Sequence, residues 1–134
     1  VTSYRAVVAQ GRVGPGQWVA VHGCGGVGLA AVMIALACGA QVVAIDLKPA
    51  ALERARALGA AHGVEARPEV DVSAAIRALT GGGAHVSLDA LGSAVTCLNS
   101  VLCLRKRGRH VQVGLLPGEA REAALPMNVV LVTL

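Results

Sequence analysis

Three glycines and one aspartate are the residues of this chain whose types and spacing suit a phosphorylated ligand. Gly23, Gly25 and Gly28 fit the pattern G-x-G-x-x-G, and Asp46 follows the last of them by 18 residues. The first glycine allows a sharp turn, the second leaves room for a pyrophosphate, and the third lets a helix pack closely. Free N–H groups at that helix start attract phosphates. Asp46 would accept hydrogen bonds from both hydroxyls of an adenine ribose and would repel a 2′-phosphate.

The elements around these residues decide whether the pattern carries information. Apolar residues 17–21 predict a buried strand before the turn, 25–38 predict a helix that is apolar nearly all round, and 41–45 predict a second buried strand that ends beside Asp46. The competing interpretation is a glycine turn that binds nothing. The register of strand, turn, helix and acid favours a dinucleotide site over that interpretation.

The rest of the chain continues the same alternation. We expect a short helix at 2–10, further helices at 49–58, 72–79 and 93–105, and further strands at 61–65, 84–88 and 109–113. Such an order predicts an α/β, Rossmann-type doubly wound parallel sheet, here lacking its last strand, with 126–134 forming a helical turn, the start of a sixth strand, or both. Gly23, Asp46, Asp89 and Gly114 each follow a strand, so they should share the edge where the strands end.

Composition limits the other possibilities. The chain has 134 residues, 54% of them hydrophobic and 1% aromatic, which predicts one domain with an aliphatic core. The longest apolar run, 27–40, is shorter than the roughly 20 residues of a membrane span, so we expect no membrane contact. With no export leader visible we expect a cytoplasmic protein, and the first residue, Val1, indicates a piece of a longer one.

Neither the cysteines nor the positive charge indicate a further site. Cys24, Cys38, Cys97 and Cys103 form no C-x-x-C pair, which argues against zinc and for reduced thiols, and Cys24 is read as a tolerated small residue. The net charge is +4, with its densest cluster at 105–109. We expect this cluster at a solvated helix end, with Gly108 as the stop, and no nucleic-acid binding, because Trp18 and Tyr4 are too few to stack bases.

With these residues identified, the chain resembles the coenzyme domain of the zinc-dependent, medium-chain alcohol dehydrogenases. The resemblance covers almost the whole chain and rests on segments 2–6, 19–28, 43–46, 86–92 and 108–115, in the family's order. It implies that 13–134 form an NAD-binding domain and that 1–12 lead in from an absent catalytic domain. The parent enzyme would transfer hydride between a small alcohol or aldehyde and NAD(H), and would be a homo-oligomer.

The resemblance also implies roles for individual residues. Thr2 would lie at the nicotinamide end, Asp46 would bind the adenine ribose, and Ala90 and Leu91 would flank the coenzyme. Lys48 would reach the ribose or a phosphate, although the family's usual basic residue falls where this chain has Ala51. Asp46 implies NAD rather than NADP, and the positive charge of Lys48 is a mild argument for NADP. The pyrophosphate would be held by Gly23, Cys24, Gly25, Gly26, Val27 and Gly28, and the nicotinamide side lined by Val113, Gly114 and Leu115.

The same resemblance implies zinc only in the full-length parent. The family's zinc, held by Cys, His and Cys or Glu, polarises the alcohol oxygen. Two of those ligands belong to the absent domain, and the remaining Cys is expected upstream of Thr2. The family's four-cysteine zinc lobe is missing as well, and His22, His62, His85 and His110 are scattered. We therefore expect no metal site and no catalytic residue in this chain, which should bind coenzyme without catalysing.

Other interpretations fit less of the chain. A stand-alone NAD-responsive regulatory module would explain the glycine turn and Asp46 equally well, but not Thr2 or 108–115. A short-chain reductase needs Tyr-x-x-x-Lys, and Tyr4 is followed by Val8. A methyltransferase shares the turn and the acid, and 86–92 argue against it. Zinc-free reductases of the same superfamily usually carry a basic residue for NADP where this chain has Asp46.

Overall fold

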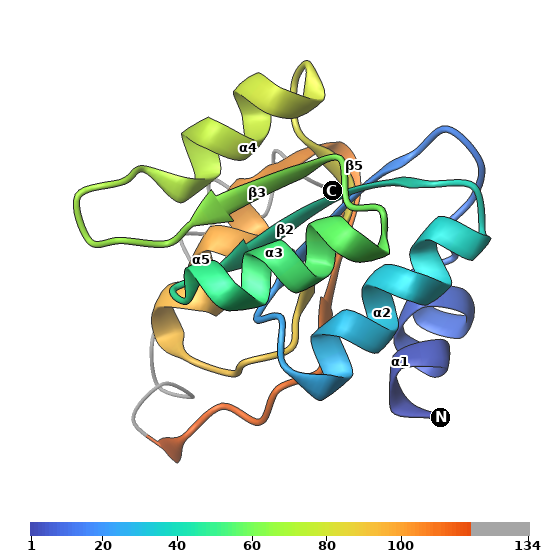
Figure 1. Ribbon diagram of the computed structural model, residues 1–134, viewed down its shortest axis with the longest axis horizontal. Coiled ribbons are helices and arrows are strands. Elements are labelled where there is room, and N and C mark those ends of the chain that lie inside the picture. The colour runs from blue at the N-terminus through green and yellow to red at the C-terminus, as the bar shows by residue number, and fades with distance from the viewer. Residues whose placement is uncertain (119–134) are drawn as a thin grey trace.

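A five-stranded, all-parallel sheet forms the centre of the computed structural model, which describes residues 1–118 (Figure 1). The strand order is β3-β2-β1-β4-β5, which confirms the predicted doubly wound α/β architecture. The positions at 126–134 and the question of a last strand lie outside the described residues. The strands are β1 (Trp18–His22), β2 (Gln41–Asp46), β3 (His62–Glu65), β4 (Ala84–Asp89) and β5 (Leu104–Gln112). The helices are α1 (Thr2–Tyr4), the π-helix η1 (Arg5–Gln10), α2 (Gly26–Ala37), α3 (Pro49–Leu58), α4 (Val72–Thr80) and α5 (Ala94–Leu102).

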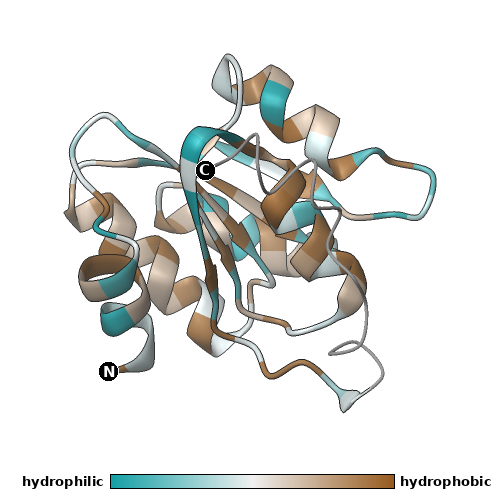
Figure 2. Ribbon diagram, turned by 180° about the vertical axis from the view of Figure 1, so that it is seen from behind, coloured by the Kyte–Doolittle hydropathy of each residue, from teal (hydrophilic) through white to brown (hydrophobic). Residues whose placement is uncertain are grey.

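The alternation of side chains along β1 and β2 builds a core on each face of the sheet. Val19 and Val42 pack towards α2 and α3, whereas Ala20 and Val43 belong to the second core, with Ile76 of α4. Figure 2 shows hydrophobic colour on the strands and on the helix surfaces next to them. These central strands are apolar on both faces because helices cover both. No helix within residues 1–118 has the length and hydropathy needed to cross a bilayer.

Most expected boundaries differ from the observed ones by a single residue, but the prediction for 93–113 is wrong in one respect. Helix α5 ends at Leu102, and Arg105–Arg109, expected at the helix end, lie within β5. The buried pair Cys103 and Leu104 starts the strand, because Ala84 donates its N–H to Cys103. A basic run directly after an amphipathic helix looks like a helix end in sequence, and tertiary pairing overrides that local signal.

The register of β5 explains how so polar a segment can join the sheet. Ala84 pairs with Leu104 and Val86 pairs with Arg109, so 105–108 bulge out of the ladder. Gly108 is not the helix stop that we expected. A Cβ there would lie 2.9 Å from the Arg105 carbonyl oxygen, so its role is to let the bulge fold back on itself. β5 is the last strand of the described sheet, where such an irregularity is tolerated.

Candidate functional site

Each of the three glycines in the turn has a different surrounding, and therefore a different reason to be glycine. Gly23 adopts φ +90°, which favours glycine, and its N–H donates to Ile45 at the end of β2. A Cβ on Gly28 would overlap the carbonyl of Gly23, so α2 approaches β1 more closely than any side chain permits. Gly25 has an ordinary φ of −80° and no atom within 4 Å of the place its Cβ would take. Packing therefore explains Gly23 and Gly28, whereas the space at Gly25 stays open.

The start of α2 offers hydrogen-bond donors next to that space. The first bond of the helix runs from the Leu29 N–H to the Gly25 carbonyl, and no side chain caps the helix. The N–H groups of Gly25, Gly26 and Val27 find no partner within residues 1–118, and all three residues are exposed. Exposed N–H groups at the positive end of a helix dipole suit an anion such as a phosphate.

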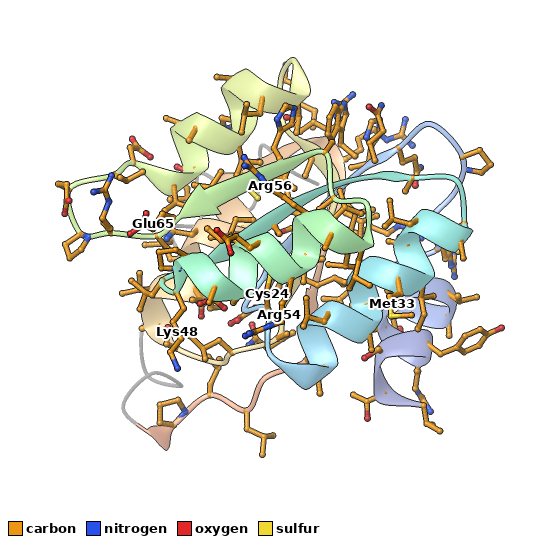
Figure 3. All side chains as sticks on the ribbon, in the orientation of Figure 1. Cys24, Met33, Lys48, Arg54, Arg56 and Glu65 are labelled. Atoms are coloured by element: carbon orange, nitrogen blue, oxygen red, sulfur yellow. The ribbon has the colours of Figure 1, made fainter. Side chains whose placement is uncertain are left out.

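The Asp46 carboxylate is held by two backbone groups beside this turn. Its Oδ2 accepts the Cys24 N–H and its Oδ1 accepts the Lys48 N–H, both at 2.8 Å. Each oxygen keeps a lone pair, so a fixed acceptor pair remains for further hydroxyl donors. Sequence reasoning missed the contact between Cys24 and Asp46, which ties the acid to the glycine turn. Lys48 itself is exposed at the start of α3, where Figure 3 labels it.

The Cys24 side chain points away from the open space. It is 1% exposed, and burial together with the nearby Asp46 raises the pKa of its thiol to about 11. Its Sγ lies 3.8 Å from the Ile45 carbonyl oxygen and 3.9 Å from that of Val21. Cys24 therefore stays a thiol at neutral pH and acts through its N–H, which positions Asp46.

Two loops complete the edge where the strands end, which we call the carboxyl edge. Leu91 lies against the turn, because a Cβ on Gly23 would come within 3.1 Å of the Leu91 Cβ. Ala90 donates its N–H to His22, at the end of β1. On the other side, the N–H groups of Val113 and Gly114 both donate to the Asp89 carbonyl. The expected sharing of one edge by the residues after β1, β2, β4 and β5 is confirmed.

The amino-terminal helix joins this edge through one side chain. The Ser3 Oγ donates to the Val27 carbonyl at 2.8 Å, so α1 is attached to the first turn of α2. Thr2 is exposed next to this attachment. The structure thus brings Thr2 to the same end of the molecule as the glycine turn, as Figure 1 shows for α1 and α2. Ser3 gave no signal in the sequence, because one hydroxyl in a short helix is unremarkable.

The Asp89 carboxylate is buried and accepts hydrogen bonds from groups in or next to the two loops, not from solvent. Its Oδ1 accepts the N–H groups of Leu91 and Gly92, and its Oδ2 accepts the Gln112 side-chain amide. The same Gln112 amide donates to the Gly114 carbonyl, so both of its protons are used. Its Oε1 must then accept from the His110 Nε2–H at 3.0 Å. Asp89 therefore fixes both loops and the orientation of His110.

The same order of donors and acceptors continues from His110 into the interior. His110 Nδ1 accepts from the Ser100 hydroxyl, which accepts from Ser87, and Ser87 accepts from His22 Nε2–H at 3.1 Å. Cys103 donates its S–H to the same Ser87 oxygen. The proton of His22 is thereby placed on Nε2, and its buried Nδ1 has no partner within residues 1–118. Sequence reasoning placed His22 among scattered surface or supporting histidines. It could not detect a hydrogen-bonded chain in which His22 and Ser87, which are bonded directly, are 65 positions apart.

His22 makes the stability of the fold dependent on pH. Burial, its largest cause, lowers the His22 pKa from 6.5 to about 4, with His110 adding to the effect and Asp89 opposing it. Below pH 6.5 the unfolded chain takes up a proton that the folded chain refuses, so stability is present above that pH and is lost towards pH 4. We expect His22 alone to remove about 3 kcal/mol of unfolding free energy over this range. Urea unfolding at pH 7.5 and pH 4.5 measures the loss.

The matched variant for this test is His22→Leu, which removes the titrating group. His85 and His110 have pKa values lowered by burial as well, so some acid sensitivity should remain. The variant should lose clearly less stability between the two pH values than the wild type does. An equal loss in both proteins would contradict the assignment to His22.

A metal centre is not found in the described part of the chain. Within residues 1–118 no group of three or more His, Cys, Asp and Glu side chains is placed to hold an ion. His22 and His110 belong to the hydrogen-bonded chain just described, and His85 accepts the Trp18 N–H at Nδ1. The donor groups among residues 1–118 therefore do not fit a zinc ion.

Comparison with known proteins connects this geometry to a family. A family model described as zinc-binding dehydrogenase matches residues 26–133. The chain is 44% identical over 105 residues to a geraniol dehydrogenase of Castellaniella defragrans, covering 77% of this chain and 28% of that protein. It is 38% identical over 119 residues to an alcohol dehydrogenase of Geobacillus stearothermophilus, covering 89% of this chain and 34% of that protein. Hence it spans about a third of the length of these relatives.

The fold agrees with a solved structure of the same kind. An alcohol dehydrogenase zinc-binding domain protein from Burkholderia ambifaria superposes with a TM-score of 0.92 at 34% sequence identity. The superposition covers 98% of this chain and 35% of that protein. The similarity therefore extends over the whole sheet and its helices, not over the glycine turn alone.

Proposed function

Because the chain belongs to the family of zinc-binding dehydrogenases, we propose that it is the NAD-binding part of a zinc-dependent alcohol dehydrogenase. The parent would oxidise a primary or secondary alcohol to an aldehyde or ketone, and NAD would accept the hydride. Relatives named geraniol dehydrogenase and alcohol dehydrogenase support this reaction class. Their greater length supports assigning substrate binding and catalysis to segments outside this chain.

The observation that carries the coenzyme proposal is the open space at Gly25, which adjoins N–H groups without a partner in residues 1–118, together with the Asp46 carboxylate held beside the same turn. The pyrophosphate would accept from the N–H groups of Gly25, Gly26 and Val27, and the adenine ribose would donate to Asp46. Cys24 contributes by holding Asp46, while Gly23 and Gly28 shape the turn. Lys48 is exposed beside Asp46 and supplies a cation near the ribose.

The apolar part of the carboxyl edge suits the nicotinamide half. Leu91 is 59% exposed and Leu115 is 86% exposed, which is high for leucines in a small domain. Both belong to the loops that Asp89 fixes, together with Ala90, Val113 and Gly114. Thr2 would approach this half from α1. A nicotinamide ring that covers these leucines would be stabilised by the burial of their apolar surface, and the fixed loops would orient that ring.

The remaining proposals concern the parent protein. Zinc would be held by residues outside this chain, so no step of the reaction is assigned to the residues described. The parent would act on a small alcohol or aldehyde. It would be a homo-oligomer located in the cytoplasm, and it would bind neither nucleic acid nor a membrane. The chain by itself should bind NAD(H) without turnover.

Coenzyme preference tests the proposal. Titration of the folded chain with NADH, followed by energy transfer from Trp18, should saturate. NADPH should bind at least about tenfold more weakly, because its 2′-phosphate would meet the Asp46 carboxylate across a hydrogen-bond distance. Asp46→Ala should weaken NADH binding and reduce the difference in affinity between NADH and NADPH. Equal affinity of the wild type for both coenzymes would contradict the role given to Asp46.

A further inference from the structure

A hollow lies at the edge of the sheet opposite the carboxyl edge, where the strands begin. Its volume is about 280 Å³. It lies between the bulge of β5, the start of β4, and the segment that leads into β1. Figure 2 shows hydrophilic colour where β5 begins. The lining residues are Gly11, Arg12, Gln17, His85, Val86, Arg105, Lys106, Arg107, Gly108 and Arg109.

The lining is cationic and lacks carboxylates. Arg12, Lys106, Arg107 and Arg109 are exposed, and Arg105 is half-buried. Within residues 1–118 the ion pairs are those of Arg67 with Glu65 and Glu69, so none of these five cations is neutralised there. Of the five, Lys106, Arg107 and Arg109 lie within β5 and not at a helix end. Five cations around one hollow, without a carboxylate partner in that part of the chain, repel each other, and an anion bound among them would relieve that repulsion.

The polar side chains of the lining are oriented as donors. Arg105 donates Nε to the Gly83 carbonyl and Nη2 to that of Thr80, which fixes its guanidinium. Gln17 accepts the Gly14 N–H at Oε1, which leaves its amide protons. His85 accepts the Trp18 N–H at Nδ1, which places its proton on Nε2. A lining whose hydrogen-bonded groups still offer donors and whose exposed groups are cationic is complementary to a ligand that only accepts hydrogen bonds.

The backbone around the hollow is strained at two positions. Within residues 1–118 the non-glycine residues with positive φ are Arg12, at 50°, and Arg107, at 65°. They come from segments almost a hundred positions apart, yet both line the same hollow. Such conformations cost free energy in arginine and persist only where the surrounding structure holds them. Here the two strained residues come together at one hollow.

From these observations we propose that the hollow binds a small polyphosphate anion of about the size of pyrophosphate, separately from the coenzyme site. Its volume lies just under the roughly 300 to 1,000 Å³ of typical small-molecule sites, which suits a compact ligand. Arginine forks bind phosphate oxygens bidentately. A nucleic acid fits less well, because no Trp, Tyr or Phe side chain of residues 1–118 lines the hollow and Trp18 is stacked on His62.

Amide NMR spectra of the full chain, recorded during titration with inorganic pyrophosphate, test this proposal. The coenzyme site could bind the probe as well, and the spectra separate the two by position. We expect saturable shifts at Arg12, His85 and 105–109, whatever happens at 23–28. The His85 ring pKa, which burial and Arg105 lower, should rise when the anion is bound.

Paired charge variants provide the control. Lys106→Gln with Arg107→Asn removes two cations, and asparagine tolerates the positive φ of position 107. This variant should weaken binding at the hollow about tenfold or more, as the loss of charge-assisted hydrogen bonds implies. Arg5→Gln with Arg56→Gln removes two exposed cations that do not line the hollow, and should change the affinity less than about twofold. Equal weakening by both pairs, shifts that do not saturate, or shifts confined to 23–28 would overturn the proposal.

Discussion

Replacing Gly28 by alanine is expected to lower the free energy of unfolding by about 3 kcal/mol. The added Cβ would overlap the carbonyl of Gly23 and lie 2.8 Å from its carbon. Both are backbone atoms, so no side-chain rotation relieves the contact. Gly23 cannot retreat easily, because its N–H is bonded to Ile45 and its other side lies against Leu91. Urea unfolding followed by circular dichroism measures the loss.

Gly26→Ala is the matched control for this substitution. Gly26 lies in the same first turn of α2, and nothing lies within 4 Å of the Cβ that it would gain. The control should stay within about 0.5 kcal/mol of the wild type, as exposed substitutions usually do. If Gly28→Ala were as stable as Gly26→Ala, then the close approach of α2 to β1 would not be what requires glycine at position 28.

The second large effect is expected from Gly25→Val, which should weaken NADH binding and leave the stability of the fold largely unchanged. The backbone at Gly25 is extended, with φ −80° and ψ −158°, which a β-branched residue adopts readily. Within residues 1–118, chain neighbours aside, no atom lies within 4 Å of the Cβ that would be added, so the fold should persist. The valine would occupy the space that the proposal gives to the pyrophosphate. We expect NADH affinity to fall at least a hundredfold, which corresponds to about 3 kcal/mol.

Gly14→Val controls for the loss of a glycine in a turn. Gly14 has no atom within 4 Å of its missing Cβ either, and it precedes β1 at the edge opposite the coenzyme site. Its NADH affinity should match that of the wild type. Thermal unfolding of both variants checks that they are folded. Wild-type affinity in Gly25→Val would mean that the glycine pattern serves the chain turn and not a ligand.

The parts of the site that sequence reasoning predicted follow from local pattern and topology. Gly23 and Asp46 each follow a buried strand, and parallel strands bring such residues to one edge whatever their separation in the chain. Helix α2 was predictable because its apolar residues end at the glycine at position 39 and begin at the turn. The family resemblance added Ala90, Leu91 and 113–115, whose placement depends on strand order.

The parts that escaped prediction depend on tertiary contacts between single side chains. The Cys24 N–H that holds Asp46, the Ser3 hydroxyl that holds α1, and the chain from His22 to Asp89 follow no periodicity. The bulge of β5 was missed because its register is set by pairing of Arg109 with Val86, not by the propensities of 105–108. Charged residues at the margin of a sheet read as a helix end or a loop until the partner strand is known.

The most direct test of the coenzyme site is the map of amide shifts that NADH produces in the folded wild-type chain. We expect saturable shifts that cluster at 23–28, Asp46, Lys48, 90–92 and 113–115, five segments that meet at the carboxyl edge. Amides of the β5 bulge should move far less. Saturable shifts centred elsewhere, or none in a chain whose spectrum shows it to be folded, would contradict the claim that these segments form one NAD site.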